Sequence, residues 1–176
     1  MENVVQKINN LSIGFRSQKG EEISILKNIT TEIKRGETVG IVGESGSGKS
    51  TLALAMMGYI KHGLFTTSGE CTFNSNDLLK MDGRALEKIR GRKIAMIPQN
   101  AGQALTPNLK IGYQIDEALR LHTDLNKIDR DKKISELLNK VRLPSPETMA
   151  LRYPHELSGW QQQRVAVAMA LAGTPE

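Results

Sequence analysis

The sequence predicts an α/β fold: a mixed sheet with antiparallel N-terminal strands, followed by a helical subdomain. Three observations lead to this fold class. Two N-terminal runs alternate apolar and polar residues, a short apolar run leads through a glycine-rich loop into an apolar helix, and the chain beyond Gln99 has helical periodicity. The length of 176 residues, with 39% hydrophobic and 24% charged residues, fits an ordinary globular protein with one sizeable core.

The first hundred residues carry mostly strand signals. The segments with strand character are 4–15, 23–33, 39–42, 69–73 and 94–97. The first two form an antiparallel pair with a turn between them, and the apolar run 39–42 suits a strand that is buried on both faces of a parallel sheet. A largely buried helix is expected over 49–60, and a basic helix is expected near 84–90.

Beyond Gln99 the periodicity is that of helices. Apolar residues three and four positions apart predict a helix around 111–119 and another around 134–141, which Pro144 ends. A further helix is expected over 158–172. We therefore expect the segment 100–157 to form a helical subdomain inserted into a sheet-centred domain.

Composition limits the classes of partner. The net charge of +5 is spread along the chain and interleaved with acidic residues, so it predicts a solvated basic surface and no nucleic-acid site. The single Cys71 has no partner for a disulfide or a thiolate metal site, which fits a reducing compartment. No apolar run approaches the roughly 20 residues of a membrane helix, so we expect any membrane association to come through a partner.

A glycine-rich loop is the strongest local motif. It reads Gly43-Glu44-Ser45-Gly46-Ser47-Gly48-Lys49-Ser50 and is followed by Thr51, which matches the phosphate-loop pattern G-x-x-x-x-G-K-[ST]. Its place between a predicted strand and a predicted helix is the context that the motif requires. Backbone N–H groups of such a loop point at phosphate oxygens, and the following helix adds its positive dipole end. We expect Lys49 to reach the β- and γ-phosphates of a purine nucleoside triphosphate, and the Ser50 hydroxyl to bind Mg²⁺.

Two further stretches narrow the class. The run Leu157-Ser158-Gly159-Trp160-Gln161 resembles the LSGGQ signature of ABC ATPases, and 94–99 resembles the strand that leads into their Q-loop glutamine. The order of the three motifs is that of the ABC family, and the resemblance covers nearly the whole chain. It implies a P-loop NTPase fold of ABC type, with a nucleotide-binding core at 1–99, a helical subdomain at 100–157, and a signature helix with the start of a Walker B segment at 158–176.

Shorter segments look most like the ATP-binding subunits of oligopeptide, dipeptide and nickel importers. They are 68–70, 88–91, 105–107, 111–112 and 153–158. The resemblance implies a second ATP-binding subunit, identical or different, packed head to tail with this one. It also implies two integral membrane permease subunits, an extracytoplasmic substrate-binding protein, and a peripheral place on the cytoplasmic side of the cell membrane. The cargo would be a peptide, nickel or a metal chelate.

The resemblance also assigns roles outside the loop. Gln99 would be a catalytic residue whose side-chain carbonyl reaches Mg²⁺ or the attacking water. Ser158 and Gly159 would hold the γ-phosphate of an ATP bound to the partner subunit, because a helix start offers backbone N–H groups to an anion. A plain N-cap role for Ser158 is compatible with this one.

This sequence departs from the family pattern in three places. Trp160 replaces the second signature glycine, and its indole could block dimer closure, pack against the helical subdomain or reflect a sequencing error. No Trp or Tyr precedes the phosphate loop to stack on adenine, which leaves Phe15 as a candidate or as simple core. The chain ends at Glu176, where the family would continue into the Walker B strand, so we expect a fold that is incomplete at its C-terminus. None of its histidines can be assigned as the family's switch histidine; these are His62, His122 and His155.

These inferences lead to one main hypothesis and two alternatives. The main hypothesis is an importer subunit whose full-length dimer hydrolyses ATP, while the 176-residue chain itself is inactive. One alternative is a nucleotide-binding module that does not hydrolyse ATP. The other is a soluble ABC ATPase that is not coupled to transport.

Overall fold

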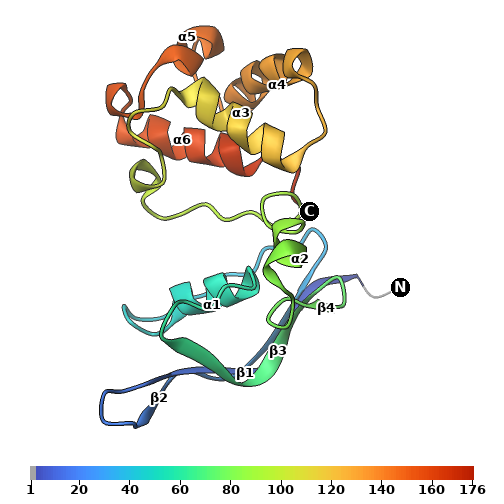
Figure 1. Ribbon diagram of the computed structural model, residues 1–176, viewed down its shortest axis with the longest axis vertical. Coiled ribbons are helices and arrows are strands. Elements are labelled where there is room, and N and C mark those ends of the chain that lie inside the picture. Colours follow the sequence, from blue (N-terminus) through green and yellow to red (C-terminus); the bar gives the residue numbers. More distant parts are fainter. Residues whose placement is uncertain (1–2) are drawn as a thin grey trace. The chain divides into compact units, whose positions relative to one another are not determined.

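The computed structural model describes residues 3–176, except for the side chain of Ala101 (Figure 1). The chain divides into two compact units, the first ending at Leu86 and the second beginning at Glu87. The expected division into a core at 1–99, a helical subdomain at 100–157 and a signature helix at 158–176 is based on function and stays a prediction.

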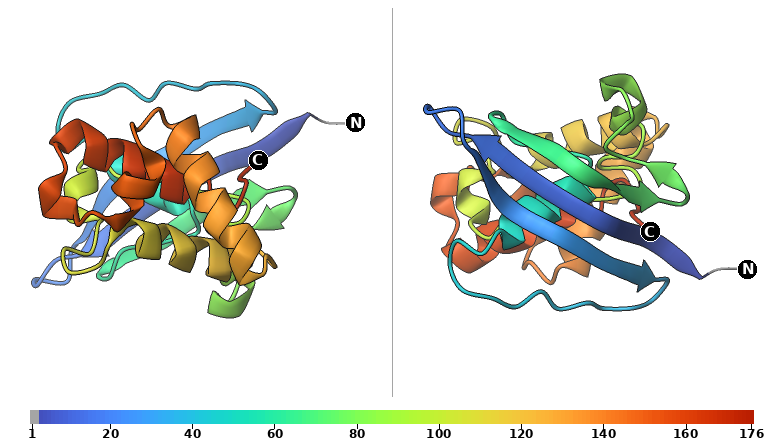
Figure 2. Two further views of the ribbon diagram at one scale, coloured as in Figure 1. Left: turned by 90° about the horizontal axis from the view of Figure 1, so that it is seen from above. Right: turned by 90° about the horizontal axis from the view of Figure 1, so that it is seen from below.

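The first unit is an antiparallel sheet with one helix packed on it. Its strands are β1 (Val4–Arg16), β2 (Glu22–Lys34), β3 (Leu64–Phe73) and β4 (Asn76–Asp77). They lie in the order β2-β1-β3-β4, and Figure 2 shows the three long strands side by side. The expected N-terminal strand pair and the strand at 69–73 are therefore confirmed, the latter as part of a longer strand.

Helix α1 (Lys49–Met56) supplies the apolar layer over this sheet. It ends four residues earlier than the sequence pattern predicts, because the chain turns at Gly58, which has a positive φ of 70°. The core of the first unit combines buried residues of the sheet and the helix, namely Ile8, Leu11, Ile13, Leu26, Leu52, Ala55 and Cys71.

Two expected strands do not form. The segments 39–42 and 94–97 have no strand pairing, and Val42 is 96% exposed. A strand of a parallel sheet needs a hydrogen-bonded neighbouring strand along its length. Among the described residues, the only such pairing of these two segments is the isolated parallel bridge between Arg90 and Ile94. The prediction of strands at these two places is therefore wrong for this structure. The basic helix expected near 84–90 is the shorter α2 (Gly83–Glu87).

The second unit is helical, as the periodicity predicts. Its longer helices are α3 (Ile111–His122), α4 (Lys127–Lys140) and α6 (Gly159–Ala170), and its shorter ones are η1 (Ala101–Gln103), α5 (Pro146–Leu151) and η2 (Pro154–Glu156). The two apolar stripes expected on α3 and α4 meet α6 in one core. This core includes Ile111, Ile115, Leu119, Ile134, Leu137, Leu138, Val165 and Ala168.

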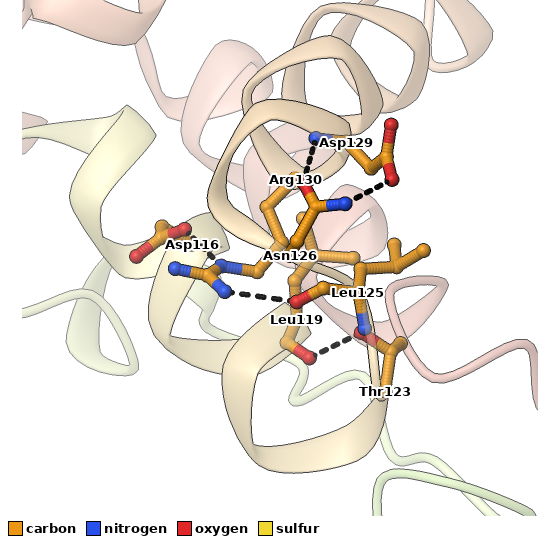
Figure 3. A network of polar contacts seen from close by, with 7 residues as sticks. All are labelled: Asp116, Leu119, Thr123, Leu125, Asn126, Asp129 and Arg130. Carbon is orange, nitrogen blue, oxygen red and sulfur yellow. Dashed lines mark hydrogen bonds and ion pairs between the residues drawn. The ribbon is translucent and has the colours of Figure 1, made fainter.

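A polar network fixes the corner between α3 and α4 (Figure 3). The Arg130 Nε donates a hydrogen bond of 2.6 Å to the Asp116 carboxylate, and the same guanidinium donates one of 3.0 Å to the Leu125 carbonyl. Asn126 caps α4 by accepting a hydrogen bond from the Asp129 backbone N–H at 3.0 Å. The start of α4 is thus held by its own cap and by an ion pair to α3.

No described helix has both the length and the apolar character that crossing a membrane would take.

Candidate nucleotide-binding site

The glycine-rich loop and the first turn of α1 make the most defined candidate site. Gly46 and Gly48 both have left-handed backbone conformations, with φ of 84° and 88°. Gly48 is also the N-cap of α1, and a Cβ atom there would lie 2.7 Å from Leu26 Cδ2 and 3.1 Å from the Ile25 carbonyl oxygen. Both the backbone angle and the close approach of β2 therefore require glycine at this position.

The start of the loop is equally tight. The Ser47 backbone N–H donates a hydrogen bond of 3.2 Å to the Glu44 carbonyl, which closes a turn. A Cβ atom on Gly43 would lie 2.8 Å from the Ser47 hydroxyl oxygen. A side chain at this position would fill the inside of the turn, so the loop keeps a concave face that is lined by backbone.

Lys49 brings the one side-chain cation of the loop to that concave face. Its ammonium donates hydrogen bonds of 2.8 Å to the Gly43 carbonyl and 2.6 Å to the Glu44 carbonyl, and it lies 3.4 Å from the Ser47 hydroxyl. These acceptors are neutral, so the ammonium has no carboxylate among its hydrogen-bond partners. An anion placed there would add Coulomb attraction to the hydrogen bonds of the same ammonium, so it would compete well with the neutral carbonyls.

Helix α1 adds further positive potential. Its first intrahelical hydrogen bond runs from Leu52 N–H to the Gly48 carbonyl, so the preceding amides have no partner within the helix. No acidic residue lies in the first turn to neutralise the dipole. The Ser50 hydroxyl is exposed beside these amides and Thr51 is half-buried. The residues present therefore fit a bound phosphate chain and a hard cation with oxygen ligands.

The structure places the predicted loop residues 43–51 together at the start of α1. It places the predicted signature residues Ser158 and Gly159 together at the start of α6, in the second unit. Gln99 is exposed just before η1 in that second unit. Its roles toward Mg²⁺ and water stay predictions. Sequence reasoning missed Gln162 of α6, whose amide donates a hydrogen bond of 2.8 Å to the Pro154 carbonyl and so joins α6 to η2. A polar residue at i+4 from an N-cap was the available signal for such a contact.

Ser158 is the N-cap of α6 and has an extended backbone, with φ of −66° and ψ of 159°. The Gln161 side-chain oxygen accepts hydrogen bonds from the Ser158 backbone N–H at 2.9 Å and from the Ser158 hydroxyl at 3.2 Å. A Cβ atom built on Gly159 meets nothing within 4 Å. The helix start is thus held by side chains, and its first residue has free space around it.

Trp160 lies on the side of α6 and is 54% exposed. The Arg164 guanidinium carbon lies 5.1 Å from the centroid of its ring. The choice among the alternatives that the sequence leaves open for this residue stays a prediction.

The aromatic and histidine candidates of the sequence have ordinary surroundings. Phe15 is half-buried on β1 opposite Ile23 and Leu64, and its contact with adenine stays a prediction. His62 and His155 are exposed. Burial, and secondarily the nearby Arg92 charge, lower the pKa of the His122 imidazole. Within the described residues, no group of three or more His, Cys, Asp or Glu side chains is placed to hold a metal ion.

Comparison with known proteins identifies the class to which this loop belongs. A family model described as "ABC transporter" matches residues 26–176, which include the phosphate loop and the signature. The chain belongs to the ABC transporter family, as an ATP-binding domain. The resemblance drawn from the three motifs is thereby confirmed.

Relatives with curated names extend this result. The chain is 37% identical to the oligopeptide transport ATP-binding protein OppD of Bacillus subtilis over 97% of its own length and 48% of the relative's. It is 39% identical to the dipeptide transport ATP-binding protein DppD of Haemophilus influenzae over 96% of its length and 51% of the relative's. The chain therefore spans about half the length of the curated relatives that it matches.

A solved structure confirms the fold class. It is the dimeric structure of a post-hydrolysis state of the ATP-binding cassette MJ0796 bound to ADP and Pi. The TM-score is 0.83 at 34% sequence identity, and the match covers 97% of this chain and 70% of that one. The ABC ATPase fold, with its antiparallel N-terminal sheet and its helices, is thus shown for this ABC ATP-binding domain at partial length.

Proposed function

We propose that this ABC domain supplies the ATP-binding and energy-coupling part of an importer, and that its cargo is a peptide. The observation that carries the proposal is the loop from Gly43 to Lys49, in which Gly48 has no room for a side chain and the Lys49 ammonium is held on the concave face. The names of the relatives refer to oligopeptides and dipeptides, which favours a peptide over nickel or a metal chelate.

The loop residues would each contact a different part of Mg-ATP. The backbone N–H groups of 43–51 would donate to the phosphate oxygens, and Lys49 would exchange its carbonyl partners for the β- and γ-phosphates. Ser50 would be a ligand of Mg²⁺, and Gln99 would be a second ligand or orient water. Bound Mg²⁺ would supply charge neutralisation between the β- and γ-phosphates.

The signature would act on a nucleotide held by another subunit. Ser158 and Gly159 begin a helix whose first amides have no intrahelical partner, which suits a γ-phosphate presented from outside the chain. This role requires a second ATP-binding subunit, the same or different. We further propose two membrane permeases, an extracytoplasmic binding protein and a peripheral position on the cytoplasmic side of the cell membrane. Hydrolysis in the complete dimer would reopen it and drive import.

Replacing the loop lysine tests nucleotide binding. Lys49→Ala removes the ammonium that the loop holds on its concave face, and a charge-assisted contact contributes about 1.5–3 kcal/mol, or roughly ten- to a hundredfold in affinity. Titration with a fluorescent ATP analogue in the presence of Mg²⁺ measures this loss. Lys61→Ala is the matched control, because Lys61 is exposed outside the loop. Equal affinities for the two variants would contradict the assignment of the loop.

Uptake assays test the cargo. Deleting the gene should abolish uptake of labelled di- and oligopeptides and leave nickel uptake unchanged. A plasmid copy should restore peptide uptake, whereas a Lys49→Ala copy should not. Normal peptide uptake in the deletion strain, with loss of nickel uptake, would replace peptide by nickel as the cargo.

A further inference from the structure

Trp160 and Arg164 form a cation–π pair on one side of α6. They are four residues apart, so their side chains project from neighbouring turns of the same helical face. The Arg164 guanidinium carbon lies 5.1 Å from the centroid of the Trp160 ring, within the range of a cation–π contact. Trp160 is the only tryptophan of the sequence.

The same guanidinium also holds the end of another helix. Arg164 Nη1 donates a hydrogen bond of 2.7 Å to the Val141 carbonyl and one of 3.2 Å to the Arg142 carbonyl. Val141 is the C-cap of α4, and Arg142 follows it with a left-handed φ of 57°. The last carbonyls of a helix lack intrahelical partners, and the negative end of the helix dipole lies there. A cation at this place donates hydrogen bonds to the carbonyls and is attracted by the dipole.

The indole covers this cationic bridge from one side. Arg164 is half-buried, while Trp160 is 54% exposed. A flat ring over the guanidinium shields one of its faces from water and restricts its rotamers. Both effects favour the hydrogen bonds to the end of α4. Water competes less for the guanidinium, and the restricted side chain loses less conformational entropy when these bonds form.

We propose that Trp160 is a positioning residue, which fixes Arg164 on the C-terminal end of α4 and thereby holds the first turn of α6 in place. The first turn carries Ser158 and Gly159, so the consequence for phosphate binding rests on the proposed function. The positioning itself does not.

The geometry also explains how a bulky residue fits at this place in the signature. The ring contacts a residue one turn further along the helix, so the indole lies along the side of α6. The space around Gly159 stays open, with nothing within 4 Å of a Cβ atom built there.

The fluorescence of the single tryptophan tests the cation–π contact without any nucleotide. In Arg164→Met the indole loses its cationic partner, so we expect a shift of the emission maximum and a rise of about 1.5-fold or more in acrylamide quenching. Arg120→Met is the control, since Arg120 is an exposed arginine on α3. Spectra and quenching that match in Arg164→Met, Arg120→Met and the unmodified protein would overturn the proposal.

Thermal unfolding tests the positioning role through a conservative rescue. Trp160→Leu keeps an apolar side chain with good helix propensity but has no π face, and Trp160→Phe keeps the π face. We expect Trp160→Leu to lower the unfolding midpoint by a few degrees and Trp160→Phe to restore at least half of that loss. In an Arg164→Met background the two variants should unfold at the same temperature. A Phe variant no better than Leu, or a difference that persists without Arg164, would overturn the proposal. Loss of ATP binding in Lys49→Ala is independent of both results, so a failure of the proposed function is recognised separately.

Discussion

The glycine-rich loop before α1 and the start of α6 both present backbone N–H groups at a helix N-terminus, yet they are built by different means. The loop takes its shape from the backbone: Gly46 and Gly48 have positive φ, and Lys49 binds back to loop carbonyls. The start of α6 takes its shape from side chains, since the Gln161 side chain accepts a hydrogen bond from the N-cap Ser158 and Arg164 joins α6 to α4. A helix start that is shaped by its backbone depends on glycine at fixed positions, whereas the start of α6 depends on the side chains around it.

Replacing Gly48 before α1 and Gly159 at the start of α6 with alanine should give the largest difference in the free energy of unfolding. In Gly48→Ala the new Cβ would lie 2.7 Å from Leu26 at a φ of 88°, so strain and overpacking together should lower the free energy of unfolding by about 2–4 kcal/mol. In Gly159→Ala the Cβ meets nothing, and the better helix propensity of alanine should raise stability by up to about 1 kcal/mol. Urea unfolding measures both. Equal effects would break the distinction between the two helix starts.

The ion pair between Arg130 and Asp116 tests how much a polar side-chain contact contributes to the stability of the helical unit. Arg130 and Asp116 are 15% and 23% exposed, so Arg130→Met should cost about 1.5–3 kcal/mol by leaving a poorly solvated carboxylate without its partner. Lys133→Met breaks a more exposed pair with Glu136 on the same helix, and it should cost less than about 0.5 kcal/mol. Thermal or urea unfolding of the two variants gives the comparison. A small effect of Arg130→Met would mean that apolar packing alone places α4.

The first unit has a buried, uncharged contact between Gln6 and the Cys71 thiol. The stability of this unit should therefore depend on pH in the alkaline range. Gln6 donates to the Cys71 sulfur at 3.6 Å and to the Met56 carbonyl at 2.6 Å. Burial, and to a lesser degree the Asp77 charge, raise the pKa of the Cys71 thiol from 9.0 to about 11, against the lowering effect of the Gln6 hydrogen bond. The stability contributed by the protonated thiol is complete below pH 9 and is lost as the pH rises toward 11.

Comparing the unmodified protein with Cys71→Ala isolates this contribution. Between pH 8 and pH 10.5 the unmodified protein should lose up to about 2 kcal/mol more than the variant, because only its unfolded state releases the thiol proton early. Urea unfolding at the two pH values measures the difference, and the cost of the smaller side chain cancels because it is present at both. Equal losses would indicate a thiol with an ordinary pKa.

Local patterns predicted most of the elements. The alternation over 4–15 and 23–33, the helical stripes of α3 and α4, and the loop motif all act between residues near in sequence. Prediction failed at 39–42 and 94–97, where the apolar runs were read as strands. A parallel strand depends on neighbours from distant parts of the chain, and a single run of residues does not specify whether they are present.

The sequence by itself determined the family and the helical nature of the second unit, and it predicted the phosphate-binding role of the glycine-rich loop. Three ordered motifs and periodicity suffice for these, because backbone conformation and local burial follow from residue type. The tertiary structure decided which glycine has no room for a side chain, which cation caps α4, and where the indole of Trp160 lies. Each of these depends on contacts between residues from separate elements, so no local pattern could reveal them.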